Sequence, residues 1–255
     1  MNNMSGIKFD FRAKNVVITG ASRGIGFSIA KSFLKSGANV INISRSPQNT
    51  KKPAGNNYKF VQLDITNLKS VKDWIESYTK NGKRIDIWVN NAGVCLQSKL
   101  LQVTEEHWDR TFETNLKSLF FLSLFAAEHM KKNRNGVIIN ASSFAAVMPS
   151  VGSCVYAASK AGVASITKSM AAELAPYGIR VNSYCPGVIE TDMNKVLIRK
   201  KKNLADAIAL GRYGNSDEVA QAVLFLCSDG ASYLTGANIE ISGGKYLVQN
   251  QTDAL

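Results

Sequence analysis

A tyrosine and a lysine four positions apart, in the segment YAASK, are the residues of this sequence best suited to acid–base chemistry. Residues at this spacing share one face of a helix, so Tyr156 and Lys160 are expected to lie side by side. A phenol titrates at about pH 10, and a neighbouring ammonium lowers its pKa by favouring the phenolate. Tyr156 can therefore protonate a ketone during reduction, or act as the base in the reverse reaction. The alternative is a solvated pair on a helix surface.

A glycine-rich segment, TGASRGIG at 19–26, offers a place for a phosphate. It follows NVVIT, a β-branched run typical of a buried strand. Gly20, Gly24 and Gly26 permit a tight turn and a close approach of the backbone to phosphate. The amides that open the next helix would then face the anion. The spacing is G-x-x-x-G-x-G, whereas the dinucleotide fingerprint is G-x-G-x-x-G, so a tight turn without a ligand is the alternative.

These residues must be positioned by a chain in which short apolar strands alternate with helices. This alternation predicts a doubly wound α/β Rossmann fold, a seven-stranded parallel sheet with helices on both faces, in one domain over 1–255. Ligands then bind at the carboxyl ends of the strands. Predicted strands are 15–19, 39–44, 59–63, 85–90, 137–141, 180–184 and 237–242, and predicted helices are 25–36, 67–79, 105–131, 155–175 and 216–227.

Composition argues against several classes of protein. The 255 residues are 45% hydrophobic and 20% charged, which suits one well-buried α/β domain. The longest apolar run, at 119–127, is too short to span a membrane, and the first residues lack the core of a signal peptide, so we expect a cytoplasmic protein. The four cysteines and two histidines form no cluster, so no metal site is expected. The net charge of +12 fits an anionic ligand or acidic partner, and no nucleic-acid motif accompanies it.

Further motifs follow the other predicted strands: NNAG at 90–93, TNLKSLFFL at 114–122, NASS at 140–143 and CPGVIETDM at 185–193. In this order, together with YAASK, they resemble the short-chain dehydrogenase/reductase family from about Asn15 to Tyr246. In that family G-x-x-x-G-x-G is the ordinary phosphate-binding spacing. The resemblance implies an NAD(P)-dependent oxidoreductase that reduces a ketone or oxidises a secondary alcohol.

The resemblance also implies a catalytic set of four residues. Tyr156 would be the proton donor, and Lys160 would bind the nicotinamide ribose and activate the tyrosine. Ser143 would hydrogen-bond the substrate carbonyl; the adjacent Ser142 is the alternative, and the thirteen-residue offset to Tyr156 favours Ser143. Asn115 would hold a proton-relay water, unless it faces a neighbouring backbone instead. The complete set argues against a non-catalytic redox sensor that binds NADPH.

The predicted cofactor is NADP(H). In NAD enzymes of this fold an acidic residue at the end of the second strand binds the ribose hydroxyls. Here that position is Ser44, followed by Arg45. Without a carboxylate a 2′-phosphate can enter, and Arg45 and Arg23 can reach it; solvated surface arginines are the alternative.

The remaining cofactor contacts come from the resemblance. It places Asp64 and Ile65 at the adenine, Asn91 at the adenine ribose and Thr191 at the carboxamide. The full predicted set is Gly20, Ser22, Arg23, Gly24, Ile25, Gly26, Ser44, Arg45, Asp64, Ile65, Asn91, Ala92, Gly93, Tyr156, Lys160, Pro186, Gly187, Val188, Thr191 and Met193.

The substrate class is indicated by two segments in the second half of the chain. PGVIETDM and SYLTGANIEISGG look most like 3-oxoacyl-(acyl-carrier-protein) reductases, with glucose-type sugar dehydrogenases and other small secondary-alcohol dehydrogenases as alternatives. An Arg-Asp pair expected after NNAG is absent, and Tyr177 replaces one basic residue expected to contact the carrier. Arg134, the other basic contact, is present. We therefore expect a small carbonyl or alcohol substrate, bound to a carrier in the acyl case.

Two further expectations concern mobility and assembly. A substrate lid is expected near 190–212, where Lys195 and the run Arg199–Lys202 carry five positive charges. This cluster either attracts an anionic substrate or acidic carrier, or is a solvated helix face. By resemblance, helices 105–131 and 155–175 pair across a dimer interface, and two dimers form a homotetramer.

Overall fold

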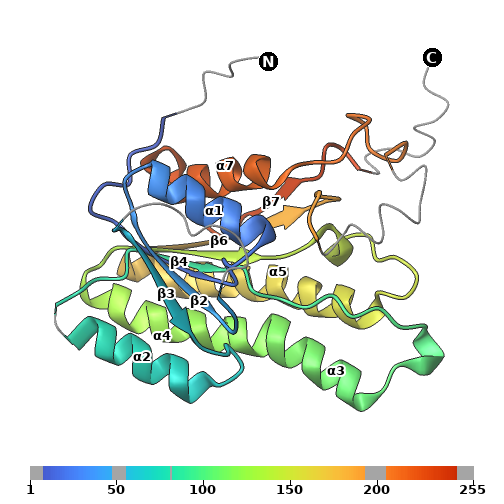
Figure 1. Ribbon diagram of the computed structural model, residues 1–255, viewed down its shortest axis with the longest axis horizontal. Coiled ribbons are helices and arrows are strands. Elements are labelled where there is room, and N and C mark those ends of the chain that lie inside the picture. The colour runs from blue at the N-terminus through green and yellow to red at the C-terminus, as the bar shows by residue number, and fades with distance from the viewer. Residues whose placement is uncertain (1–7, 48–55, 81, 193–204, 246–255) are drawn as a thin grey trace.

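The strands of the molecule are the short apolar segments that the sequence predicts. The computed structural model describes residues 8–47, 56–80, 82–192 and 205–245, and in that part of the chain seven parallel strands form one sheet (Figure 1). Their spatial order is β3-β2-β1-β4-β5-β6-β7. The strands are β1 (Asn15–Thr19), β2 (Asn39–Ser44), β3 (Tyr58–Gln62), β4 (Ile87–Asn90), β5 (Gly136–Ala141), β6 (Ile179–Pro186) and β7 (Asn238–Ile241).

Helices cover both faces of the sheet. Successive residues of a strand point to opposite faces, so Val16 of β1 packs into one apolar core and its neighbour Val17 into the other. Burial on both faces explains the continuous apolar runs of the strands, and the predicted doubly wound α/β fold is confirmed. Figure 1 shows α1 (Gly24–Lys35) and α7 (Ser216–Cys227) on one face, and α2 (Leu68–Lys80), α4 (Ser118–Lys132) and α5 (Cys154–Leu174) on the other.

The strand order creates a position for a ligand. β1 pairs with β2 on one side and with β4 on the other, so the chain progresses from β1 in opposite directions. Open α/β sheets bind ligands outside the carboxyl ends of the strands at such a reversal. The glycine-rich segment after β1 and the NNAG segment after β4 therefore meet at this edge.

The predicted helix 105–131 differs from the structure in its middle. Helix α3 (Glu105–Phe112) is followed by a π-helical turn, Glu113–Lys117, and only then by α4. The Ser118 hydroxyl donates to the carbonyl oxygen of Glu113 at 2.7 Å, and the Asn115 side chain bonds the backbone of Val94. Apolar periodicity does not reveal this turn, because the contacts that accompany it are with another loop. Single π turns of this kind are frequent at functional sites.

Candidate active site

Most of the predicted cofactor contacts line one cleft at the carboxyl edge of the sheet. Gly187 and Val188 are not on its lining: the Gly187 amide donates to the carbonyl oxygen of Ile241 at 3.0 Å, and Val188 packs against Ile208. Met193 lies outside the described residues. The predicted contacts on the lining are Gly20, Ser22, Arg23, Gly24, Ile25, Gly26, Ser44, Arg45, Asp64, Ile65, Asn91, Ala92, Gly93, Tyr156, Lys160, Pro186 and Thr191.

Glycines make the cleft floor. A Cβ atom on Gly26 would lie 2.5 Å from the carbonyl oxygen of Gly20 and closer still to Asn91 Nδ2, so no side chain fits there. Asn91 Nδ2 donates to the carbonyl oxygens of Thr19 and Gly20 at 3.0 and 3.1 Å, which ties the loop after β4 to the loop after β1. At the start of α1, the N-cap residue Arg23 makes no side-chain capping bond. The first amides of this helix are therefore available to an anion such as a pyrophosphate.

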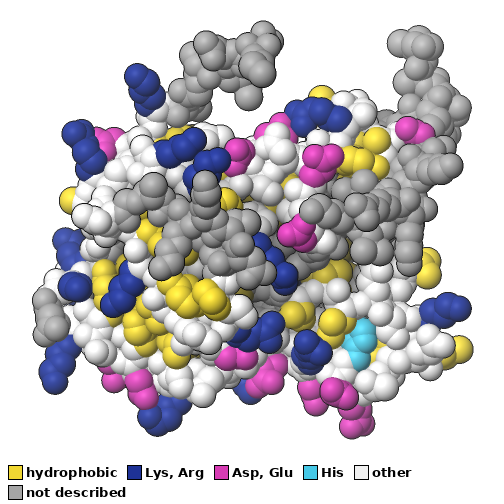
Figure 2. Space-filling view, viewed as in Figure 1, with side chains coloured by type: hydrophobic (Ala, Val, Ile, Leu, Met, Phe, Trp, Pro, Cys, Tyr) yellow, Lys and Arg dark blue, Asp and Glu magenta, His cyan; other side chains and the backbone are white. Residues whose placement is uncertain are grey.

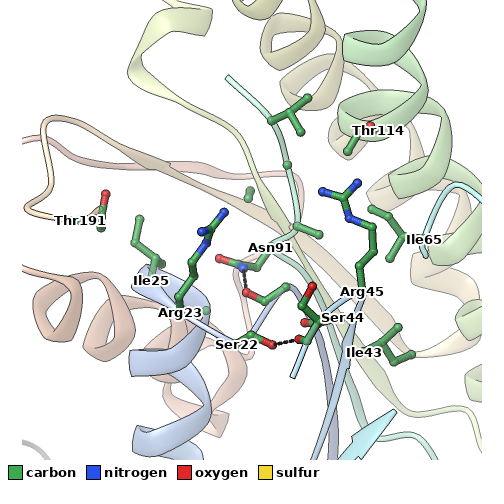
Figure 3. A pocket seen from close by; sticks show the side chains of 18 of the residues that line it. Ser22, Arg23, Ile25, Ile43, Ser44, Arg45, Ile65, Asn91, Thr114 and Thr191 are labelled. Atoms are coloured by element: carbon green, nitrogen blue, oxygen red, sulfur yellow. Dashed lines mark hydrogen bonds between the residues drawn. The ribbon is translucent and has the colours of Figure 1, made fainter. Parts of the chain in front are cut away.

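Two arginines flank the end of the cleft near β2. In Figure 3, Arg23 and Arg45 extend on either side of Ser22 and Ser44. Both arginines are exposed. Arg45 Nη1 lies 4.0 Å from Asp64 Oδ2, with both side chains reached by solvent, so this ion pair is weak. The guanidinium groups are therefore available to a second anionic group.

A buried lysine stands at the other end of the cleft. Lys160 is only 4% exposed, and its Nζ donates to the carbonyl oxygen of Ala141 at 2.8 Å. Burial lowers the pKa of Lys160 to about 8, an effect that Cys95 partly opposes. Lys160 Nζ lies 5.9 Å from the ring centroid of Tyr156, so the two side chains are neighbours as their spacing predicts.

The pKa of Tyr156 differs from the sequence-based expectation. Burial raises the pKa of Tyr156 to about 12, and a hydrogen bond with Ser143 lowers it in part. The expectation considered only the ammonium of Lys160 and omitted the cost of placing a phenolate among apolar neighbours. Tyr156 is nevertheless partly exposed and lines the cleft.

The two adjacent serines have different surroundings. Ser142 is 3% exposed, and its hydroxyl donates to the carbonyl oxygen of Lys160 at 3.2 Å, so it fastens β5 to α5. Ser143 is only half-buried, and its hydroxyl oxygen accepts the amide of Ala145 at 3.2 Å. Of the two, Ser143 is the one that interacts with the phenol of Tyr156.

Asn115 connects the NNAG loop to α5. Its Oδ1 accepts the amide of Val94 at 2.8 Å, and its Nδ2 donates to the carbonyl oxygen of Val94 at 2.9 Å and to Ser159 Oγ at 3.1 Å. Ser159 in turn donates to the carbonyl oxygen of Tyr156 at 2.7 Å. Both N–H groups of the amide are thus used within the protein. This arrangement corresponds to the alternative expectation, in which Asn115 faces a neighbouring backbone. The proton-relay role stays a prediction.

Two polar residues that hold the NNAG loop were missed by sequence reasoning: Tyr184 in the cleft wall and Thr19 at the end of β1. Tyr184, in β6, is buried, lines the cleft and donates to Asn91 Oδ1 at 2.9 Å. Thr19 Oγ1 accepts the amides of Asn91 and Ala92 at 3.1 and 3.0 Å. Their position at or near the carboxyl ends of strands was the available signal. Nothing local distinguishes them from other strand residues.

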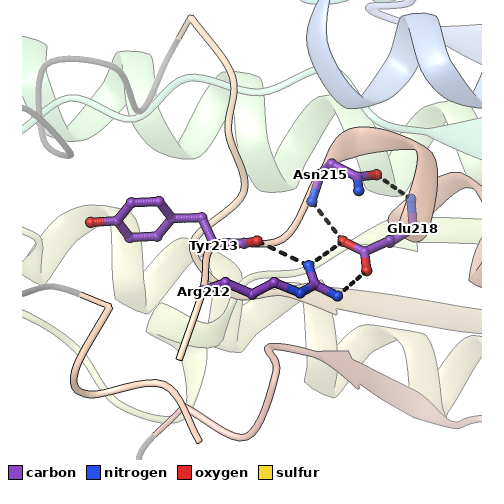
Figure 4. A network of polar contacts seen from close by, with 4 residues as sticks. All are labelled: Arg212, Tyr213, Asn215 and Glu218. Carbon is purple, nitrogen blue, oxygen red and sulfur yellow. Dashed lines mark hydrogen bonds and ion pairs between the residues drawn. The ribbon is translucent and has the colours of Figure 1, made fainter. Parts of the chain in front are cut away.

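Residues 193–204 of the lid expected near 190–212 lie outside the described residues, together with the basic cluster Lys195 and 199–202. Its two ends are described. The amide of Gly214 donates to the carbonyl oxygen of Val188 at 3.0 Å, and the amide of Glu190 donates to that of Gly214 at 2.8 Å. Beside this junction, Arg212 forms two hydrogen bonds with Glu218, which also completes a capping box with Asn215 at the start of α7 (Figure 4).

Lys and Arg side chains are spread over the face shown in Figure 2. Within the described ranges, no three His, Cys, Asp or Glu side chains are grouped to hold a metal ion. Among the helices that the structure describes, none combines the length and apolarity needed to cross a membrane.

Comparisons with known proteins find similar chains over nearly the whole length. A family model described as enoyl-(acyl carrier protein) reductase matches residues 20–245. The 3-oxoacyl-[acyl-carrier-protein] reductase FabG of Vibrio cholerae is 40% identical over 243 residues, which cover 94% of this chain and 100% of the relative. The structure of a short-chain type dehydrogenase/reductase from Mycobacterium marinum is similar with a TM-score of 0.88 and 33% identity, covering 93% of this chain and 97% of the other.

A second solved structure is similar over a comparable length. It is described as a candidate NAD(P)-dependent gluconate 5-dehydrogenase from Beutenbergia cavernae with bound NADP at low occupancy. Its TM-score is 0.89 at 27% identity, and the match covers 95% of this chain and 100% of the other.

Proposed function

Because the chain belongs to the short-chain dehydrogenase/reductase family, and is therefore a nicotinamide-dependent oxidoreductase of carbonyl or alcohol groups, we propose that it reduces 3-oxoacyl thioesters with NADPH. One observation carries the proposal. The chain is similar along nearly its whole length to a 3-oxoacyl-[acyl-carrier-protein] reductase, and its cleft brings Tyr156 and Lys160 to the same edge of the sheet.

In this proposal Tyr156 donates the proton that the substrate carbonyl oxygen gains. Its pKa, raised by burial, keeps the phenol protonated at neutral pH, which is the form that a general acid needs. Ser143 interacts with the phenol and is half-exposed, so its hydroxyl can also bond the substrate oxygen and stabilise charge there. NADPH, when bound, supplies the hydride to the carbonyl carbon.

Lys160 has two tasks in the proposed mechanism. An ammonium has three N–H donors, and the carbonyl oxygen of Ala141 takes one of them. The others are available to the hydroxyls of a nicotinamide ribose. The positive charge also lowers the cost of the phenolate that remains on Tyr156 when the proton has left. Asn115 and Ser159 hold the helical turn that carries Tyr156 and Lys160.

The preference for NADPH rests on charge. Ser44 stands where a carboxylate would repel a 2′-phosphate, and Arg23 and Arg45 extend beside it (Figure 3). The floor at Gly26 and the uncapped start of α1 suit the pyrophosphate of the same dinucleotide. We include the cleft-lining residues of the predicted cofactor set in this proposal.

A carrier-bound substrate is supported by a basic position at the end of α4. Lys131 Nζ lies 4.1 Å from the ring centroid of Tyr177, the residue that replaces an expected basic contact. The Arg134 side chain is nearby, because it donates to the carbonyl oxygen of Pro176 at 3.0 Å. Lys131 thus supplies a positive charge beside Tyr177, where the sequence lacks the expected basic residue. An acidic carrier would find two cations there.

The experiment is a substrate panel with the purified protein. NADPH oxidation is measured with a 3-oxoacyl thioester on acyl carrier protein, the same acyl group on coenzyme A, several aldoses and small ketones. We expect the highest kcat/KM for the carrier-bound thioester. A sugar is the second candidate, because one similar structure is described as a gluconate 5-dehydrogenase; a higher kcat/KM for an aldose or sugar acid would replace the thioester proposal.

We extend the proposal to assembly, organisation and location. Trp108, Phe120 and Leu124 are 46%, 37% and 36% exposed along α3 and α4. A second copy would cover this apolar stripe, which supports a homotetramer built on the α4 and α5 helices.

We also propose one catalytic domain over 1–255 with a lid near 190–212. We further propose a cytoplasmic location, which suits the four free cysteines.

A further inference from the structure

A buried asparagine lies beneath the arginine-flanked end of the cleft. Asn42 is in the middle of β2, between Ile41 and Ile43, and is 0% exposed. A polar side chain in a buried strand needs partners, and Asn42 has four. They are the amide of Ala21, Ser44 Oγ, Tyr58 Oη and Ser22 Oγ.

These partners fix the orientation of the Asn42 amide group. The backbone amide of Ala21 can only donate, and it points at Asn42 Oδ1 at 3.0 Å. The other terminal atom must therefore be Nδ2, which only donates. It donates to Tyr58 Oη at 2.9 Å and to Ser22 Oγ at 3.2 Å. Burial raises the pKa of Tyr58, and the hydrogen bond from Asn42 lowers it in part.

The hydroxyl hydrogens of the two serines follow from this orientation. Ser44 Oγ lies 2.7 Å from Asn42 Oδ1, an acceptor, so Ser44 must donate its single hydrogen there. Ser22 Oγ accepts from Asn42 and lies 2.8 Å from the carbonyl oxygen of Ser46, so its hydrogen goes to that carbonyl. Both serines line the cleft. Neither has a hydrogen left for a ligand, and both present lone pairs.

We propose that Asn42 is a positioning residue that influences cofactor choice. Its hydrogen bonds leave Ser22 and Ser44 able to accept hydrogen bonds from the adenosine ribose but not to donate them. A 2′-phosphate, itself an acceptor, then gains nothing from either hydroxyl and depends on Arg23 and Arg45. A ribose 2′-hydroxyl can donate to Ser44. The network therefore opposes the arginines and moderates the preference for NADPH. This inference rests on the proposed function, because it assumes that a nicotinamide dinucleotide occupies the cleft.

The test is direct binding of NADPH and NADH to the full chain by isothermal titration calorimetry. Ser44→Ala removes an acceptor, so NADH should bind about 2–12-fold more weakly while NADPH does not weaken, and the preference for NADPH should rise. If Ser44 instead donates to the phosphate, the same change should reduce the preference by roughly 10–150-fold. A preference that falls or does not change would overturn the inference.

Arg45→Ala provides the comparison. It should weaken NADPH by roughly 10–150-fold with little effect on NADH, because a hydrogen bond to a charged group is lost. Arg84→Ala is the matched control, since Arg84 pairs with Asp86 before β4 and is not among the residues lining the cleft. A parent protein that binds neither dinucleotide overturns the proposed function and the inference together. NADPH binding with a reduced preference in Ser44→Ala overturns the inference alone.

A second variant tests Asn42 itself. In Asn42→Ala the hydrogen of Ser44 is released and can turn to the cleft, so the preference for NADPH should rise by roughly 10-fold or more. In the Ser44→Ala background the same change should produce no rise. A rise of equal size in both backgrounds would show that Asn42 acts without Ser44 and would overturn the assignment. Thermal melting of each variant shows which of them are folded, and Ser44→Ala decides the question if Asn42→Ala is not.

Discussion

Replacing Gly26 by alanine tests the floor of the cleft. The added Cβ would lie 2.5 Å from the carbonyl oxygen of Gly20 and within the contact distance of Asn91 Nδ2, so α1 or the loop after β4 must move. Overpacking of this kind costs about 1–3 kcal/mol. The two hydrogen bonds from Asn91 to Thr19 and Gly20 contribute about 0.5–1.5 kcal/mol each and would be weakened.

We expect NADPH to bind at least about 5-fold more weakly to Gly26→Ala, because the backbone that must move lines the pyrophosphate position and a loss of about 1 kcal/mol in binding free energy is about a 5-fold change in Kd. Calorimetric titration measures the affinity, and Tm should fall by about 2–4 °C for each kcal/mol. Gly230→Ala is the control, because its Cβ would meet only ordinary contacts, at 3.4 Å from Ser228 Oγ and 3.7 Å from Phe225. Equal affinity and Tm for both variants would refute the close packing of α1 against the loop.

Three further outcomes are expected. Because burial lowers the pKa of Lys160 to about 8, Lys160 is charged below that pH and neutral above it, so kcat/KM for reduction should fall about tenfold per pH unit above 8; a flat profile up to pH 10 would contradict its role. Asn215→Ala removes the acceptor for the Glu218 amide at 2.9 Å and should cost about 0.5–2 kcal/mol in urea unfolding, whereas an unchanged midpoint would show the cap to be unimportant. Phe120→Lys should lower the mass found by light scattering, and an intact tetramer would exclude the α4 face from the interface.

The fold was predictable because its strands are buried on both faces. NVVIT and NVINIS are read as strands from their β-branched content, and the structure places them at 15–19 and 39–44 as predicted. The break at Glu113–Lys117 was not predictable, because it is accompanied by a hydrogen bond between Asn115 and Val94, 21 positions away in the chain. The apolar periodicity of a segment does not indicate its contacts with other segments.

Most residues that line the cleft were predictable, but the pKa values of its titratable groups were not. The spacing of Tyr156 and Lys160 places them together, yet it does not show that both are buried enough to shift their pKa values in opposite directions. Asn42 is a polar residue in an apolar strand, but no role was assigned to it from the sequence. Its effect on Ser44 depends on the amide of Ala21, which lies in another loop and is not marked by its residue type.

The most direct measurement compares the parent with Tyr156→Phe in NADPH-dependent reduction of a 3-oxoacyl thioester. The variant keeps the ring and loses the hydroxyl that donates the proton. A positioned acid contributes about 10²–10⁴-fold, so we predict a loss of kcat of at least about 100-fold with the affinity for NADPH nearly unchanged. A kcat within a few-fold of the parent would remove Tyr156 from the mechanism and contradict the account of this cleft as a carbonyl-reducing site.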